Sequence, residues 1–304
     1  MKECQSILFV SHGTHDETEA LHSAIELAKN YKAKLDVLII YPLFPSSHDD
    51  YKKSYELFLV DNINKAIAAA KTRMAIKVDI DAGDTPDILI IQRVIRHSYD
   101  VLIKAVEPHD SKGFKALDMA LLRKCPCPVF LHRPFKHTKK LHIAVAIDVK
   151  DDEPAGHDFA LELLNLSYSL TQHCKGTLSI ISCWDFVLEH YLRNSILMDI
   201  TPGDLDKMVM DESNLSYNKL EKLIQESVID EDKPNILHIK GKPTEIIPAL
   251  LTEKNIDILI MGTVARTGIS GFIIGNTAEN ILQNLDCSLW ALKPSGFVSP
   301  VKAY

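Results

Sequence analysis

Residues 257–280 read DILIMGTVARTGISGFIIGNTAEN, and this stretch decides the fold class. Its apolar run is typical of a buried parallel strand and ends at Gly262, where such a strand opens into a ligand crevice. Three later glycines allow tight turns and close backbone approach: Gly268, Gly271 and Gly275. Asn276, with Glu279 three residues on, is a capping pattern. We therefore expect a helix to begin there with its free N–H groups facing the loop, an arrangement that suits a phosphate.

The same order of strands and helices occurs twice along the chain. An apolar strand over 7–12 corresponds to one over 143–148, and each precedes a polar turn, a long amphipathic helix and a second strand. Further matches follow in the same order: 83–89 with 241–247, 99–103 with 256–260, and 127–131 with 287–292. The alternation predicts an α/β fold of two tandem doubly wound parallel five-stranded sheets, related by a pseudo-twofold axis. Ligands of such sheets bind beyond the strand carboxyl ends, between strands one and four.

The repeat also sets the domain boundaries. We expect a first domain over 1–135, a second over 141–294, and a C-terminal tail over 295–304. The second domain is longer because an insert over 184–204 follows its second strand, on the ligand side of the sheet. This insert is expected to pack on its own domain as a helix or to line an apolar pocket.

Composition excludes several classes of protein. A net charge of −7 disfavours nucleic acid or an anionic membrane as the main partner. No run approaches the roughly 20 apolar residues that a membrane helix requires. The N-terminus leads directly into the first strand and does not resemble a signal peptide. Six cysteines are few for this length and fit buried reduced thiols, so a cytoplasmic location is expected.

These features carry a family resemblance. The chain resembles the tandem universal stress proteins, in particular the UspE-type two-domain members, along nearly its whole length, and this implies an adenine nucleotide alpha hydrolase-like fold. ATP-binding members carry a G-x-x-G motif that is followed, after nine further residues, by G-[ST]. Here the motif falls on Gly262, Ala265 and Gly275, with Asn276 in place of Ser or Thr. The Cβ of Ala265 resists positive φ, whereas Asn276 is still able to cap a helix.

The resemblance implies a nucleotide site in the second domain. In ATP-binding members a first-strand aspartate contacts the nucleoside, and Asp148 takes that place; backbone groups at Ser182 and Cys183 would contact adenine. The candidate binding residues are Asp148, Ser182, Cys183, Gly262, Thr263, Ala265, Arg266, Gly275, Asn276 and Thr277. The implied cofactor is ATP or a related adenine nucleotide, with Mg²⁺ as its companion. Asp148 fits equally well as a turn or helix-capping residue. A larger amphipathic or other non-nucleotide ligand, held between the domains, is the alternative occupant.

The first half departs further from the motif. His12 stands where Asp148 stands, and Glu107 and Asp110 in its loop would repel phosphates. We therefore expect this half to have a structural or regulatory role and not to bind ATP. His12 and His15 lack the additional ligands that zinc prefers, so no metal site is expected.

No catalytic constellation is present in the sequence. The nucleophile elbow G-x-S-x-G, the zinc motif H-E-x-x-H and the P-loop are all absent, which disfavours a dedicated NTPase. The expected function is that of a stress-response ligand-binding or sensor module; weak ATP hydrolysis and an interaction scaffold are alternatives. Exposed fifth strands tend to pair, so the two domains are expected to associate through 129–131 and 289–292, with a homodimer as a further option. Cys125-Pro126-Cys127 has neither redox nor zinc C-x-x-C spacing and is expected to begin the first of these strands.

Overall fold

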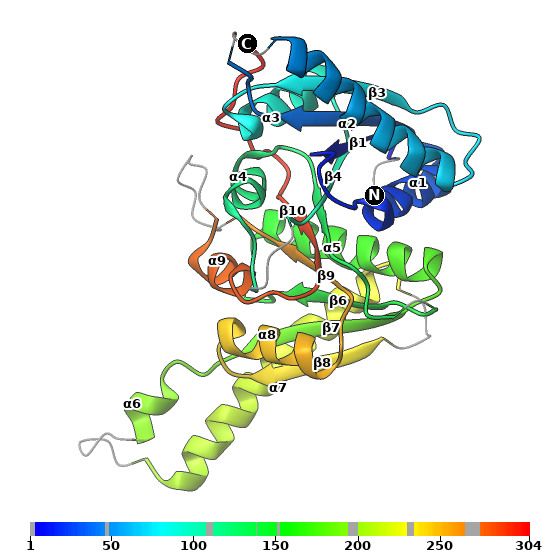
Figure 1. The fold of residues 1–304 in the computed structure, drawn as a ribbon. Coiled ribbons are helices and arrows are strands. Elements are labelled where there is room, and N and C mark those ends of the chain that lie inside the picture. The colour runs from blue at the N-terminus through cyan, green and yellow to red at the C-terminus, as the bar shows by residue number, and fades with distance from the viewer. Residues whose placement is uncertain are drawn as a thin grey trace. The chain divides into compact units, whose positions relative to one another are not determined.

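The computed structural model describes residues 4–45, 49–107, 112–137, 139–150, 153–193, 200–229, 234–264 and 274–304. Strands and helices alternate along the chain, which confirms the α/β class (Figure 1). Two compact units are formed, the first from 1–136 and 262–304 and the second from 137–261. The last part of the second repeat thus belongs to the same compact unit as the first repeat. No helix in the described ranges has the length and apolar character needed to cross a membrane.

The first unit contains a largely parallel sheet. Its strands are β1 (Ser6–Ser11), β2 (Lys34–Tyr41), β3 (Lys77–Ala82), β4 (Val101–Ala105), β5 (Val129–His132) and β10 (Ser288–Leu292). Its helices are α1 (Thr18–Tyr31), α2 (Asp49–Ala69), α3 (Pro86–His97), α4 (Ala116–Lys124) and α9 (Asn276–Leu282). The strand order is β3-β2-β1-β4-β5-β10, parallel except for the antiparallel pair β5–β10. The chain reverses its direction of winding between β1 and β4, as the repeat predicts.

The second unit repeats this order. Its strands are β6 (His142–Ile147), β7 (Thr177–Trp184), β8 (Asn235–Lys240) and β9 (Ile258–Gly262). Its helices are α5 (Pro154–His173), α6 (Glu189–Arg193), α7 (Pro202–Glu226) and α8 (Pro243–Glu253). All neighbours in the order β9-β6-β7-β8 are parallel, which corresponds to β4-β1-β2-β3 of the first unit. Helices α3 and α8 begin at Pro86 and Pro243, because proline in a first turn has a suitable φ and no N–H to leave unpaired.

The insert after β7 differs from a simple packed helix. It forms α6 and the start of α7, which contact each other. Three of its large side chains are nevertheless exposed: Val187, Leu188 and Tyr191, at 67%, 54% and 69%. The expectation that the insert packs on its own domain is therefore wrong for these three side chains. Helix α6 is a single short turn and offers little surface that could bury them.

An aspartate joins strand four to strand one in each unit. The carboxylate of Asp257 accepts the N–H of His142 at 2.8 Å, and that of Asp100 accepts the N–H of Ser6 at 2.9 Å. Each aspartate N–H returns a bond to the carbonyl oxygen of the same residue, at 2.8 Å and 3.0 Å. His142 and Ser6 begin β6 and β1, so these paired bonds fix the relative register of the two strands. Asp257 is buried, whereas Asp100 is exposed.

We expect Asp257→Ala to destabilise the protein more than Asp100→Ala. Removing the buried carboxylate leaves backbone N–H groups without water, which costs about 1–3 kcal/mol for each group. The two tryptophans, Trp184 and Trp290, lie in different units, so urea unfolding followed by fluorescence reports on the second unit in a Trp290→Phe background and on the first unit in a Trp184→Phe background. Equal losses of unfolding free energy in the two aspartate variants would contradict the view that burial makes the Asp257 carboxylate more important for stability.

The histidine at the end of β5 makes stability depend on pH. Burial lowers the pKa of His132 to about 4, and its ring contacts the Phe130 and Phe135 rings. The unfolded chain has a histidine pKa of about 6.5 and so binds more protons than the folded chain between these values. Stability is therefore lost as pH falls through this window.

We expect this loss to be smaller in His132→Gln than in the native protein. Acidification from pH 7 to about 4.5 removes on the order of 2 kcal/mol through His132. Urea midpoints at the two pH values measure the difference, and the exposed His22, changed to Gln, provides the matched control. An unchanged pH dependence in His132→Gln would exclude this explanation.

Candidate functional site

Three of the predicted site residues lie together at the carboxyl ends of β6 and β7. Asp148 directly follows β6, and the register of the two strands pairs Ile147 with Ser182. The exposed Asp148 carboxylate accepts the N–H of Lys150 at 2.9 Å, so it shapes the turn after the strand. Of the two sequence interpretations, this contact supports the turn directly.

Ser182 and Cys183 are both buried. The Ser182 Oγ has no hydrogen-bond partner in the part of the chain that the structure describes. The pKa of Cys183 is raised to about 11, first by burial and then by the Asp148 carboxylate, with Lys150 acting in the opposite direction. A buried polar atom without a partner and a nearby carboxylate therefore occupy adjacent strand ends.

The ends of the glycine loop are joined. Gly262 is the last residue of β9, and the N–H of Thr263 donates to the carbonyl of Leu292 at 3.1 Å. The N–H of Gly275 then donates to the carbonyl of Thr263 at 3.2 Å, and residues 264 and 274 form an antiparallel bridge. The loop thus leaves and returns at neighbouring points. Ala265 and Arg266, both predicted site residues, lie outside the described residues.

The prediction that Asn276 caps the following helix is wrong. Gly275 occupies the cap position of α9, with φ −60° and ψ 141°, and its carbonyl accepts the N–H of Glu279 at 2.9 Å. Helix α9 therefore includes Asn276 as its first residue, and no side chain caps it. The Asn276 and Thr277 side chains are exposed, and the backbone of Gly275 is open to any residue.

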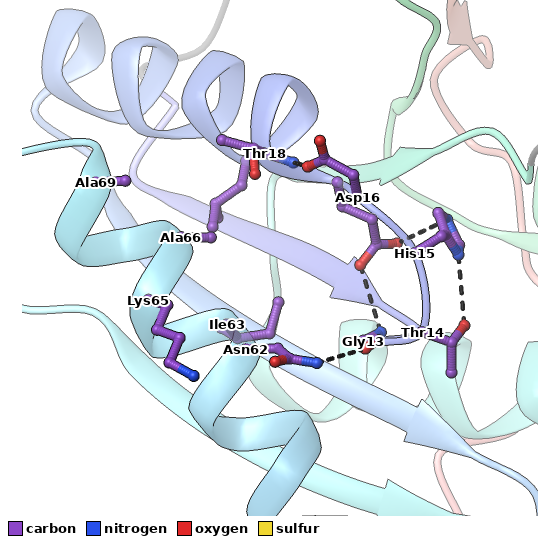
Figure 2. Close-up of a pocket in the computed structure, with 12 residues that line it drawn as sticks. Gly13, Thr14, His15, Asp16, Thr18, Asn62, Ile63, Lys65, Ala66 and Ala69 are labelled. Atoms are coloured by element: carbon purple, nitrogen blue, oxygen red, sulfur yellow. Dashed lines mark hydrogen bonds and ion pairs between the residues drawn. The ribbon is translucent and has the colours of Figure 1, made fainter.

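The first unit contains two clefts that the sequence did not predict. One, of about 520 Å³, lies between the turn after β1 and helix α2 (Figure 2). Figure 2 shows Asn62 reaching toward the backbone of Gly13, where the amide donates to the carbonyl at 3.3 Å. Gly13 has φ +64°, and a Cβ there would lie 2.8 Å from Leu59 Cδ2, so the turn requires glycine.

The second cleft, of about 390 Å³, is lined by His12, Thr14, His15, Ile40, Tyr41, Pro42, Tyr55, Glu107 and Lys115. Glu107 lies 3.5 Å from His12 Nε2 and 3.5 Å from Lys115 Nζ, and Lys115 is its charged partner. Burial, then the charge of Lys104, lowers the pKa of His12 to about 4, although Glu107 acts in the opposite direction. His12 is thus neutral near pH 7. Two tyrosines were not predicted from the sequence, Tyr41 at the end of β2 and Tyr55 in the following helix α2. The available signal was their position at and after the carboxyl end of the second strand.

A fully buried ion pair lies behind this cleft. Lys104 Nζ and Asp118 Oδ1 are 2.9 Å apart, and both side chains are inaccessible to solvent. Burial raises the pKa of the Asp118 carboxyl against the opposing effect of Lys104. Within the described ranges no three His, Cys, Asp or Glu side chains are grouped so as to hold a metal ion. The first repeat thus combines a buried ion pair with buried polar atoms that have no hydrogen-bond partner among the described residues, among them His12 Nε2 and His15 Nε2 at the second cleft.

Two curated proteins are similar to this chain over its whole length. Universal stress protein E of Photorhabdus laumondii is 26% identical over 325 residues, which cover 100% of this chain and 99% of the relative. The protein of that name from Escherichia coli K12 is 26% identical over 98% of this chain and 96% of its own length.

Two solved structures share the fold. A functionally unknown protein from Pseudomonas aeruginosa matches with a TM-score of 0.73 and 21% identity, over 97% of this chain and 94% of that chain. A universal stress protein from Archaeoglobus fulgidus matches with a TM-score of 0.64 and 16% identity, over 97% and 98%.

A family model identifies the protein family to which the chain belongs. The model described as the universal stress protein family matches residues 141–293, a range that includes every residue of the predicted nucleotide site. The fold, the repeat and the full-length relatives agree with this match. The chain belongs to the universal stress protein family.

Proposed function

We propose that the second repeat binds ATP or a related adenine nucleotide and that the protein acts as a cytoplasmic ligand sensor in a stress response. The observation that carries this proposal is the buried Ser182 Oγ, which has no partner among the described residues although it lies at a strand end. Buried hydroxyl groups normally form hydrogen bonds, so a ligand with a donor or acceptor would satisfy it. Membership of the family supports the choice of a nucleotide.

The residues at the ends of β6 and β7 suit the nucleoside part of such a ligand. Asp148 is an exposed carboxylate that offers acceptors to ribose hydroxyls or to the exocyclic amine of adenine. Its negative charge would repel phosphates, so these must lie elsewhere. We assign them, from the sequence motif, to the loop that begins at Gly262 and ends at Gly275, because glycine loops of this kind bind phosphates through backbone N–H groups. Mg²⁺ would accompany the phosphates.

Association of the repeats through their fifth strands is part of the same proposal, with a homodimer as the alternative. The antiparallel contact of β5 and β10 in the first unit supports it, because Trp290 lies opposite Phe130 and the rings stack with centroids 4.9 Å apart. Such a stacked aromatic pair stabilises a strand contact by about 0.5–1.5 kcal/mol beyond the area that it buries.

We expect Asp148→Ala to weaken nucleotide binding by about tenfold or more, which corresponds to about 1.4 kcal/mol. Isothermal titration calorimetry with ATP, AMP and adenosine, each with and without Mg²⁺, measures the effect. The matched control is His12→Ala, since His12 is the equivalent residue of the first repeat.

Each result separates the alternatives. No affinity for any adenine compound up to millimolar concentration would exclude the nucleotide but not the family. Loss of binding in His12→Ala, with retention in Asp148→Ala, would move the site to the first repeat. Any ATP hydrolysis that is unchanged in Gly275→Ala arises from another site or a contaminant. The φ and ψ of Gly275 are allowed for alanine, whereas the added Cβ would hold a phosphate away from the loop backbone.

The exposed insert favours a second candidate, a larger amphipathic or other non-nucleotide ligand. Leu188 and Tyr191 are more than half exposed and lie on the segment that follows β7. Exposed apolar side chains that cluster along a surface mark binding sites for apolar groups.

We expect such a ligand to co-purify with the native protein and to be lost from the double variant Leu188→Ser/Tyr191→Ser. Native mass spectrometry detects it as an added non-nucleotide mass, and Leu57→Ser, at an exposed position of α2, is the control. A native protein without added mass would count against this candidate.

A further inference from the structure

Two cysteines and a lysine meet in the core of the first unit. Cys125 Sγ and Cys127 Sγ are 3.5 Å apart in the turn between α4 and β5. Lys293 directly follows β10, and the antiparallel register that pairs Ala291 with Val129 continues to place residue 293 opposite residue 127. All three residues are buried, at 0%, 8% and 8% exposure.

The lysine is held beside the sulfurs without a conventional partner. Lys293 Nζ has no hydrogen-bond partner in the described part of the chain, and it lies 5.0 Å from the centre of the Phe297 ring. The neighbouring Lys124 is committed to Asp87 at 2.7 Å. A buried ammonium group is costly unless a negative charge is close. Burial lowers the pKa of Lys293, and the charges of the Cys125 and Cys127 sulfurs oppose this effect.

The thiols differ from the other buried cysteines. Burial raises the pKa of Cys125, but its hydrogen bond with the Cys127 sulfur and the charge of Lys293 outweigh this effect, so the net shift is downward. The Cys127 pKa is raised, first by its hydrogen bond with the Cys125 sulfur and then by burial. By contrast, burial followed by a nearby aspartate raises the pKa of Cys4 and of Cys183 to about 11. Thiolates are the reactive form of cysteine, so Cys125 is the candidate nucleophile.

We propose that Cys125 and Cys127 form a dithiol that hydrogen peroxide oxidises to a disulfide, with Lys293 positioned to hold the Cys125 sulfur as a thiolate. The Cys125 thiolate attacks one peroxide oxygen, the O–O bond breaks, and the products are a sulfenic acid and hydroxide. The Cys127 sulfur then attacks the sulfenic sulfur, the S–O bond breaks, and the thiol proton leaves with the hydroxyl as water. The first hydroxide takes up a proton from solvent. Two thiols and one peroxide thus give one disulfide and two waters.

The geometry requires only a small movement. The sulfurs must approach by about 1.5 Å to reach a covalent distance of about 2.05 Å. Because Cys125 is inaccessible, hydrogen peroxide has the advantage of small size over bulky alkylating agents. The proposal is independent of nucleotide binding, since none of its residues belongs to the predicted nucleotide site.

The test is peroxide treatment of the folded native protein, followed by blocking of free thiols, trypsin digestion and mass spectrometry. We expect the peptide over 125–136, which contains both cysteines, to lose two hydrogen atoms and to regain them with dithiothreitol. In Cys127→Ser the reaction should stop at a Cys125 sulfenic acid that dimedone traps. Cys4 should stay reduced, and oxidation of the exposed Met210 confirms that peroxide was sufficient.

The role of Lys293 is tested by its uncharged and charged variants. We expect Lys293→Met to be oxidised at least about tenfold more slowly near pH 7, since each unit of thiol pKa changes the thiolate fraction tenfold. The rate should rise at higher pH than in the native protein, and Lys293→Arg should restore it. An unmodified peptide despite oxidation of Met210 overturns the dithiol. A native rate and pH profile in Lys293→Met overturns the role of the lysine.

Discussion

The bond between an aspartate carboxylate and the first N–H of strand one is the constraint on which the strand-end chemistry of each unit depends. Asp100 forms it with Ser6 and Asp257 forms it with His142. Because the aspartate N–H also donates back to the same residue, a shift by one residue would break both bonds and reverse which side chains face the core. The carboxyl ends of strands one, two and four are thereby aligned at one edge of the sheet.

The two repeats use this common frame for different chemistry. In the first repeat the strand ends carry a neutral His12, and β4 carries Lys104 in a buried pair with Asp118. In the second, Asp148 is exposed beside the unpartnered Ser182, and Met261 stands where Lys104 stands. A buried ion pair rarely adds net stability but fixes its partners in place. The first repeat thus holds a buried ion pair beside an uncharged His12, whereas the second places an exposed carboxylate beside a buried hydroxyl whose hydrogen bond a ligand would complete.

The strands and their order could be predicted from sequence patterns. A buried strand requires a run of apolar residues, and such a run is visible in the sequence. They did not give the start of α9, where the carbonyl of Gly275 and not the Asn276 side chain begins the helix. They also placed residues 262–294 with the second domain, whereas compactness groups them with the first unit. Such features depend on contacts distant in sequence. The exposure of the insert and the two clefts were not predicted for the same reason. A local sequence pattern does not show which side chains remain exposed to solvent after the chain has packed.

The antiparallel pairing of β5 with β10 shows how such distant contacts create chemistry. Parallel strands would place residues that follow both strands at the same end of the pair, so Lys293 would lie far from a residue that precedes β5. The antiparallel direction instead brings the residue after β10 beside Cys127, which comes before β5. The thiol pair alone is an unremarkable buried turn, and the lysine alone is an unfavourable buried charge. Their combination stabilises a thiolate that neither segment would contain by itself, because the ammonium offsets the cost of burying the sulfur anion.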